Sequence, residues 1–548
     1  MIRDRIAELV TSAVQAAQKA GDLPVVALPE VTIDRPKIAE HGDYSANVAM
    51  RLQRAVGGKP IEIAETIRRH LPADTAVGEA RVAPPGFINF KLDEGWLKAQ
   101  VDEIVAAGPA FADRTVEPRL KEQVEFVSAN PTGPIHVGNG RGAAMGSTLA
   151  NVLRAVGHEV ETEYYVNDAG SQIETFTGSL YARYQQLFGR KAEVPEGGYP
   201  GAYVVELAEQ VKARHGDEFL RPEGEPAPAS LGRLGIELMV EQIRADLGAL
   251  NVSYDRWFHE RDLYEEGGDY DQTMALLRER GFVAEREGAV WFTSTELGED
   301  KDNVLVRSGG APTYFASDIA YHRDKFLKRR FDRVIDIWGA DHQGHVSRLK
   351  AAAKAIGADP DELVILLYQL VTLKRGGVPV RLSKRADNII TLREVVEEVG
   401  ADACRFFFLL RSADSQMEFD VDLAKRQSNE NPVYYVQYAH ARIASILRNA
   451  EGIEPSAEPP SDLAIEERAL LKRLADFPGL VAEATDRRGP QTITTYAIRL
   501  ADDFHRFYHQ HRVLGSEAEG FRLGLCRATR DVVARSLDLV GVEAPERM

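Results

Sequence analysis

A glycine-rich loop between an expected strand and an expected helix constrains the fold of this chain more than any other stretch. The loop runs from Ser128 to Gly142 and contains His136. Residues 123–127 before it alternate apolar and polar side chains, which predicts a strand, and residues 143–156 after it predict a helix with small residues on its early turns. Such a loop points backbone N–H groups and the positive end of a helix dipole at one place. It therefore predicts an anion-binding site beside an imidazole.

The chain around this loop alternates strands and helices from about residue 116 to about residue 425. Residues 159–166 predict a second strand, and residues 333–338 predict a third. This alternation indicates a parallel sheet with right-handed crossovers, and therefore an α/β domain. Residues 189–228 carry clusters of Pro, Gly and Glu, which indicate insertion loops around a helix at residues 201–215.

Two further units flank the α/β domain. Residues 1–115 predict a small α/β unit, in which residues 83–92 form a turn and a strand that carries Phe87 and Asn89. Taken alone, these two side chains indicate one packed aromatic ring and one solvated amide. Residues 426–548 predict four or five helices.

Polar residues crowd the end of the strand at residues 333–338, where Asp341, His342 and Gln343 follow. Open α/β sheets bind ligands at the carboxyl ends of their strands, so we expect a ligand contact here. His342 and His345 could suggest a metal, but they lack a third ligand at a recognisable spacing, so we predict no metal site.

Bulk properties limit the classes of function. At 548 residues we expect two to four domains. The net charge of −17 argues against non-specific nucleic-acid binding, so any RNA binding would need local basic grooves. The two cysteines form no metal or redox motif, which fits a reducing cytoplasm. No apolar run reaches membrane-spanning length, and the N-terminus does not have the pattern of a signal peptide.

A basic loop follows an expected hairpin and contains Arg381, Ser383 and Lys384. By itself it indicates only a basic surface loop. Together with the first loop, and in this order, it resembles the second of the two signatures of class I aminoacyl-tRNA synthetases. The stretch from Ser128 to His136 resembles the first signature, the HIGH motif, in the form that arginyl-tRNA synthetases carry. The KMSKS-like segment departs from the pattern at several positions but keeps its lysine.

The similarity to arginyl-tRNA synthetases extends over essentially the whole chain, and it implies a fold of three parts. These are a small N-terminal α/β domain that binds tRNA at residues 1–115, a Rossmann-like parallel-sheet catalytic domain with insertions at residues 116–425, and a C-terminal α-helical anticodon-binding bundle at residues 426–548. The implied activity is ATP-dependent ligation of L-arginine to tRNA(Arg) through arginyl-adenylate, for protein synthesis. We expect Mg²⁺ to arrive with ATP, and we expect a cytoplasmic monomer without membrane attachment.

The resemblance also implies the site residues. The implied catalytic residues are His136 and Lys384. The implied ATP-binding residues are His136, Gly138, Asn139, Arg381, Ser383 and Lys384. The implied arginine-binding residues are Glu125, Ser128, Asn130, Tyr314, Asp318, His342 and Gln343. The implied tRNA-binding residues are Phe87, Asn89, Tyr434 and Tyr438. Asn139 departs from the many class I enzymes that have a second histidine there, and an amide cannot become cationic.

The choice of arginine also has a physical argument. A guanidinium needs carboxylates and an aromatic wall. Tyr314 and Asp318 are four residues apart, so on a helix they share one face. Glu125 is a second candidate acid, and its alternative interpretation is a structural carboxylate paired with a neighbour.

Three alternatives stay open at this point. A class I synthetase for another amino acid would share both signatures. A small-molecule nucleotidyltransferase would share the histidine-containing loop but would be indifferent to tRNA. A catalytically dead RNA-binding homologue would not need His136, Gly138 and Lys384, all of which are present.

Overall fold

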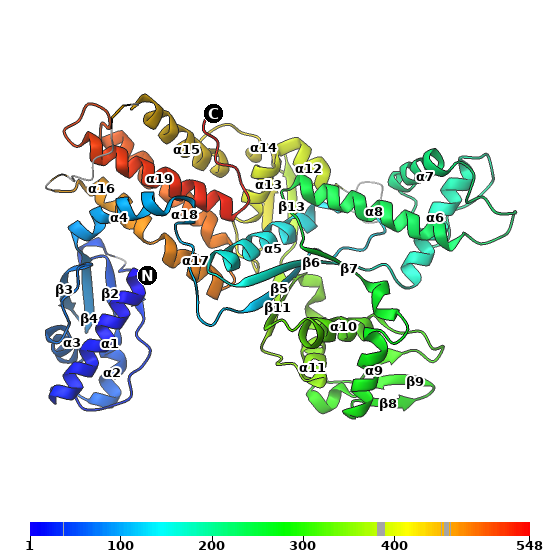
Figure 1. The fold of residues 1–548 in the computed structure, drawn as a ribbon, viewed down its shortest axis with the longest axis horizontal. Helices are drawn as coiled ribbons and strands as arrows, with labels where there is room; N and C mark the ends of the chain where they lie inside the picture. The colour runs from blue at the N-terminus through cyan, green and yellow to red at the C-terminus, as the bar shows by residue number, and fades with distance from the viewer. Residues whose placement is uncertain (37, 381–389, 451, 454–459, 461) are drawn as a thin grey trace.

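The computed structural model describes residues 1–36, 38–380, 390–450, 452–453, 460 and 462–548. Figure 1 shows an N-terminal lobe that hangs below a row of C-terminal helices, and a central sheet from which two further lobes extend to the right.

The N-terminal lobe is a four-stranded antiparallel sheet with the strand order β1-β2-β4-β3, packed against helices. Its elements are α1 (Ile2–Ala20), β1 (Ile33–Asp34), η1 (Ala39–His41), β2 (Tyr44–Ala46), α2 (Val48–Val56), α3 (Pro60–Arg69), β3 (Val77–Ala83) and β4 (Phe87–Leu92). Helix α4 (Glu94–Ala107) and the short η2 (Gly108–Ala110) then lead to the centre. Asp43 ties the lobe to the C-terminal helices, since it pairs with Arg468 at 2.8 Å and with Lys472 at 2.5 Å.

The centre is a five-stranded parallel sheet with the order β12-β11-β5-β6-β7. Its strands are β5 (Lys121–Phe126), β6 (Glu159–Val166), β7 (Arg256–His259), β11 (Arg333–Gly339) and β12 (Leu363–Tyr368). The helices α5 (Val137–Ala155), α10 (Tyr314–Arg323) and α11 (Val346–Ile356) belong to the crossovers. The predicted α/β class with a parallel sheet is confirmed. Because all five strands run the same way, the loops after them share one edge of the sheet.

Two insertions interrupt this sheet. Between β6 and β7, helices α6 (Ser171–Gln186), α7 (Ala202–His215) and α8 (Ala229–Ala249) form the arm at the upper right of Figure 1. Between β7 and β11, a lobe contains a three-stranded antiparallel sheet that we did not predict from the sequence. Its elements are η3 (Glu260–Tyr264), α9 (Asp269–Glu279), β8 (Val283–Arg286), β9 (Ala289–Phe292), η4 (Ser294–Leu297) and β10 (Asn303–Val306).

Three short stretches complete the central body. A π-helical turn, η5 (Asp324–Lys328), follows α10, and η6 (Ala340–His345) follows β11. A small sheet with the order β14-β13-β15 follows β12. Its region contains β13 (Val371–Arg375), β14 (Val378–Pro379), α12 (Leu392–Val399), α13 (Ala401–Phe408), β15 (Met417–Asp420) and α14 (Val421–Ala424).

The rest of the described chain is helical, as predicted. Its helices are α15 (Pro432–Asn449), α16 (Ile465–Ala475), α17 (Phe477–Asp486), α18 (Gln491–Gln510) and α19 (Glu519–Leu539). Arg405 on α13 joins this bundle to the centre. Its fully buried guanidinium donates to the carbonyls of Leu250 and Val540 and to the hydroxyl of Ser147 on α5. Over the described residues, no helix combines the length and apolar character needed to cross a membrane.

Candidate active site

The loop after β5 leaves the strand through a strained turn. Val127 and Ser128 have φ values of 71° and 39°, a left-handed backbone conformation that residues other than glycine rarely adopt. The Ser128 hydroxyl donates to Oε1 of Glu125 at 2.8 Å and accepts from the N–H of Tyr165 at 3.1 Å. Neighbouring strands therefore hold the start of the loop in a conformation that costs free energy, which is typical of a binding site.

His136 is the N-cap of helix α5. Its Nδ1 accepts a hydrogen bond from the backbone N–H of Gly138 at 3.1 Å. Because a backbone N–H can only donate, Nδ1 carries no proton and Nε2 is the protonated nitrogen. A Cβ on residue 138 would lie 2.8 Å from the imidazole Cε1, so the glycine is needed for this close approach. The geometry gives the loop one imidazole N–H donor beside the first turn of a helix.

The first loop is hydrogen-bonded to the chain just beyond the KMSKS-like segment. The N–H of Leu392 donates to the carbonyl of Ile135 at 2.8 Å, and the N–H of Val137 donates to the carbonyl of Ile390 at 3.2 Å. The predicted residues Arg381, Ser383 and Lys384 lie outside the described residues. Thr391, which follows those residues in the chain, forms a bridge with His136, so the described chain resumes beside the first signature.

Tyr314 and Asp318 lie on α10, one turn apart, as the sequence predicted. The Tyr314 ring is 43% exposed, and Asp318 is half-buried. Burial raises the pKa of Asp318 to about 6, against the opposing attraction of His322 and Arg348. Asp318 is thus a carboxylate that its own surroundings do not fully compensate, and a cationic ligand would do so.

Glu260 is a second such acid that we did not identify from the sequence. It begins η3 directly after β7, and only 2% of it is exposed. Its Oε2 has no hydrogen-bond partner among the described residues. Burial, with smaller contributions from Asp318 and Asp168, raises its pKa to about 7 against the opposing effect of a Ser317 hydrogen bond. The available signal was its position at the carboxyl end of a strand, where α/β sheets bind ligands.

The remaining predicted arginine-binding residues differ in how they are placed. Glu125 is buried, and its Oε2 accepts from Nζ of Lys325 at 2.6 Å, so it has the paired neighbour that its alternative interpretation required. Asn130 is exposed on the loop. His342 and Gln343 are exposed on η6 after β11. Over the described chain, no three His, Cys, Asp or Glu side chains gather as metal ligands.

In the N-terminal lobe, Phe87 and Asn89 lie two residues apart on β4, so they point to the same face of its sheet. Phe87 is half-exposed. Asn89 is buried, and its Oδ1 accepts from the hydroxyl of Ser45 at 2.7 Å. The interpretation of Asn89 as a solvated amide is therefore wrong, because the neighbouring strands place Ser45 and Arg81 on either side of it.

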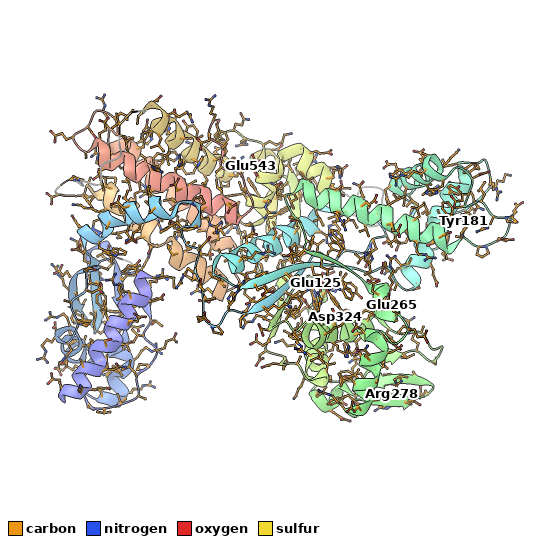
Figure 2. All side chains as sticks on the ribbon, viewed as in Figure 1. Glu125, Tyr181, Glu265, Arg278, Asp324 and Glu543 are labelled. Carbon is orange, nitrogen blue, oxygen red and sulfur yellow. The ribbon has the colours of Figure 1, made fainter. Side chains whose placement is uncertain are left out.

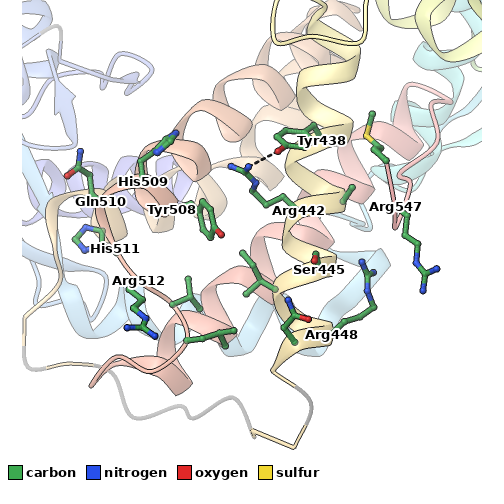
Figure 3. Close-up of a pocket in the computed structure, with 16 residues that line it drawn as sticks. Tyr438, Arg442, Ser445, Arg448, Tyr508, His509, Gln510, His511, Arg512 and Arg547 are labelled. Carbon is green, nitrogen blue, oxygen red and sulfur yellow. Dashed lines mark hydrogen bonds between the residues drawn. The ribbon is translucent and has the colours of Figure 1, made fainter.

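An open pocket of about 830 Å³ lies between α15 and the end of α18 (Figure 3). Tyr438 lines it, and its ring stacks with that of Tyr434 at 6.1 Å between centroids. The guanidinium of Arg442 lies 4.7 Å above the Tyr438 ring and 5.0 Å from the Tyr508 ring. Arg448, Arg512 and Arg547 also line the pocket. Aromatic rings with arginines suit stacked bases and phosphates, and most of these residues were missed because three distant segments supply them.

Comparison with known proteins agrees with this geometry. Residues 4–92 match the family model described as arginyl tRNA synthetase N terminal domain. Residues 101–408 match that of tRNA synthetases class I (R), catalytic domain, and residues 436–548 match the DALR anticodon binding domain. The parallel sheet, the loop after β5 and these matches define a class I aminoacyl-tRNA synthetase.

Full-length relatives show to which family of class I aminoacyl-tRNA synthetases the chain belongs. An arginine–tRNA ligase of Dehalococcoides mccartyi is 48% identical over 552 residues, which cover 100% of this chain and 99% of that protein. An arginine–tRNA ligase of Carboxydothermus hydrogenoformans is 47% identical over 549 residues, which cover 99% of this chain and 98% of that protein. The chain belongs to the arginyl-tRNA synthetase family. The solved arginyl-tRNA synthetase of Thermus thermophilus has the same fold, with a TM-score of 0.76, 23% identity and full coverage of both chains.

Proposed function

We propose that this chain is an arginine–tRNA ligase that joins L-arginine to tRNA(Arg) with ATP through arginyl-adenylate. The observation that carries the choice of arginine is the uncompensated carboxylate of Asp318, which shares a helix face with Tyr314 at the ligand edge of the sheet. A guanidinium would supply the missing positive charge, and the ring would form a wall for its planar group.

The reaction has two steps. An oxygen of the arginine carboxylate attacks the α-phosphorus of ATP and expels pyrophosphate, which gives the adenylate. A ribose hydroxyl at the 3′ end of tRNA then attacks the carbonyl carbon, and AMP leaves. The protein's task in the first step is to align the reactants and stabilise charge on phosphate oxygens. Mg²⁺ enters with ATP as part of the substrate.

We assign the ATP site to both signatures. Nε2–H of His136 donates to the triphosphate, a role that the hydrogen bond to Nδ1 supports because it fixes the proton on Nε2. Gly138 and Asn139 open α5 beside the nucleotide. Lys384, with Arg381 and Ser383, contacts the phosphates from the second signature. Lys384→Ala should therefore lower the rate of adenylate formation by orders of magnitude and leave tRNA affinity nearly unchanged.

We assign the arginine site to the residues after β5, on α10 and after β11. Tyr314 and Asp318 bind the guanidinium, together with Glu125. Ser128 and Asn130 lie near the amino and carboxylate groups, and His342 and Gln343 contribute from η6.

Three regions serve tRNA in this proposal. The domain at residues 1–115 contacts the outer corner of tRNA, where Phe87 stacks on a base and Asn89 hydrogen-bonds to it. The domain at residues 426–548 binds the anticodon loop through Tyr434, Tyr438 and the pocket beside them, whose stacked rings and arginines support this role. The domain at residues 116–425 carries out the chemistry. We propose that the protein acts as a monomer in the cytoplasm.

ATP–pyrophosphate exchange with and without tRNA(Arg) tests this proposal. We expect exchange with L-arginine that is nearly absent until tRNA(Arg) is added. Exchange that is indifferent to tRNA would favour a small-molecule nucleotidyltransferase. Efficient exchange with another amino acid would favour a different synthetase.

A further inference from the structure

Three buried carboxylates stand in a row across the middle of the central sheet. Asp336 on β11 is in register with Glu125 on β5, which is in register with Glu163 on β6. Partners in register point to the same face of a sheet, so the three acids are neighbours. Figure 2 shows Glu125 at the centre of this sheet, with Asp324 of the π-helical turn close by in the same view. Like charges side by side, and out of water, require compensating cations.

The cations come from the stretch that begins with the π-helical turn η5. Nζ of Lys325 donates to Oε2 of Glu125 at 2.6 Å and to Oδ1 of Asp336 at 2.9 Å. It also lies 4.1 Å above the ring of Tyr321, and none of the Lys325 side chain is exposed. Arg329, four residues further on, pairs with Glu163. π-Helical turns are rare and are frequent at functional sites.

Charges of neighbouring side chains compensate the carboxylates of this row. Burial alone would lower the pKa of Lys325, but Asp336, Glu125 and Glu163 outweigh it and raise that pKa. Burial would raise the pKa of Asp336, but Lys325 and His322 outweigh it and hold that pKa at about 2. The Lys325 ammonium therefore supplies the positive charge between the Glu125 and Asp336 carboxylates.

Asp318 and Glu260 differ from this row, because their charges are not compensated in the same way. Neither Asp318 nor Glu260 has an ion pair within the part of the chain that the structure describes, and burial raises the pKa of each. Glu125 connects the two sets, because one of its oxygens contacts Lys325 and the other accepts from Ser128 of the signature loop. The position of Lys325 thus determines which way the Glu125 carboxylate faces and how it supports the strained loop.

We propose that Lys325 is a positioning residue for arginine binding, which holds the Glu125 carboxylate fixed between the π-helical turn and Ser128. Lys325 touches no substrate in this scheme and acts through Glu125. The proposal rests on the proposed function, since it gives Glu125 a part in the arginine site. The groups that face the Lys325 ammonium are Glu125, Asp336, Glu163 and Tyr321, with His322 on the far side of Asp336.

Lys325→Met in the full chain tests this role through the KM for arginine in tRNA charging. Losing a charge-assisted hydrogen bond to the site should raise this KM about tenfold or more, with kcat and the KM for ATP changed much less. A general loss of structure would instead lower kcat and raise the KM for ATP as well.

Lys328→Met is the matched control. Lys328 lies on the same turn, but its side chain is 60% exposed and pairs with Asp269. We expect its arginine KM to stay within about twofold of wild type, because its ammonium lies mostly in water and its partners, Asp269 and Asp324, are not members of the carboxylate row. An arginine KM for Lys325→Met as low as that of Lys328→Met would overturn the proposal.

A double variant keeps the test decisive if Lys325→Met does not fold, and a double-mutant cycle sharpens the test if it does fold. The double variant Lys325→Met with Asp336→Asn removes one acid together with the cation, which buried sites tolerate better than a lone charge. A wild-type arginine KM in this protein would also overturn the proposal. In a double-mutant cycle, Glu125→Gln should raise the arginine KM much less in the Lys325→Met background than alone, and additive effects would contradict a role through Glu125. If the wild-type chain fails to charge tRNA(Arg), the proposed function fails; if it charges normally and these variants keep its KM, only the role of Lys325 fails.

Discussion

His136 carries two roles in this structure, and two substitutions separate them. Nδ1 caps helix α5 through the N–H of Gly138 at 3.1 Å, while Nε2–H is the donor proposed for the triphosphate. Asparagine is among the best N-cap residues, so His136→Asn should keep the cap, whereas His136→Ala should lose about 1 kcal/mol of local stability. Neither side chain places a donor where the imidazole Nε2 lies. Both variants should therefore lose about 10²–10³-fold in kcat, the usual effect of removing one transition-state donor.

Hydrogen exchange and tRNA charging measure the two roles independently. Amide exchange over the first turn of α5 should be about fivefold faster in His136→Ala than in wild type, and near wild type in His136→Asn. Charging of tRNA(Arg) should be almost equally slow in both variants. Substantial activity in His136→Asn would refute the reasoning, because capping alone would then explain the need for His136.

Three further predictions follow from other parts of the structure. Burial raises the pKa of Asp318 to about 6, and arginine binding needs the ionised form of this carboxylate. The arginine KM should therefore rise about tenfold per pH unit below that pKa and be insensitive to pH above it. Asp318→Asn should remove this pH dependence along with most activity. Gly146→Ala should lower the free energy of unfolding by about 1–3 kcal/mol, because the added Cβ would lie 2.1 Å from the ring of Phe126. At Gly248 on helix α8 the added Cβ would meet open space, so Gly248→Ala should raise this free energy by about 0.5–1 kcal/mol. Thermal unfolding measures both changes. Arg442→Ala should weaken tRNA binding about tenfold in filter binding, with the arginine KM unchanged, because the guanidinium lies against two of the rings proposed to stack on bases.

Short sequence patterns predicted the parts of the fold that depend on residues close together in the sequence. The alternation before Ser128 and the small residues after Gly142 indicated β5 and α5, but α5 begins at Val137, inside the stretch predicted as loop. The four-residue spacing of Tyr314 and Asp318 placed them correctly on one helix face, because helical periodicity depends only on neighbours in sequence. The parallel sheet followed from the alternation of strands and helices.

Contacts between distant segments could not be predicted in this way. Lys325 pairs with Glu125 across 200 residues of sequence, and the π-helical turn that places it there has no simple sequence signal. Asn89 is buried because of strand order, which its own strand does not encode. The pocket beside Tyr438 needs α15, the end of α18 and the C-terminal residues together. The predicted roles of Arg381, Ser383 and Lys384 stay predictions.

The most direct test of the central claim is charging of purified tRNA(Arg) by the purified chain, with each amino acid offered alone in the presence of ATP and Mg²⁺. We predict that L-arginine is charged, that the other amino acids are not, and that Asp318→Asn removes most of the charging while ATP still binds. Efficient charging of any other amino acid, or full activity of Asp318→Asn, would contradict the claim that these carboxylates select arginine.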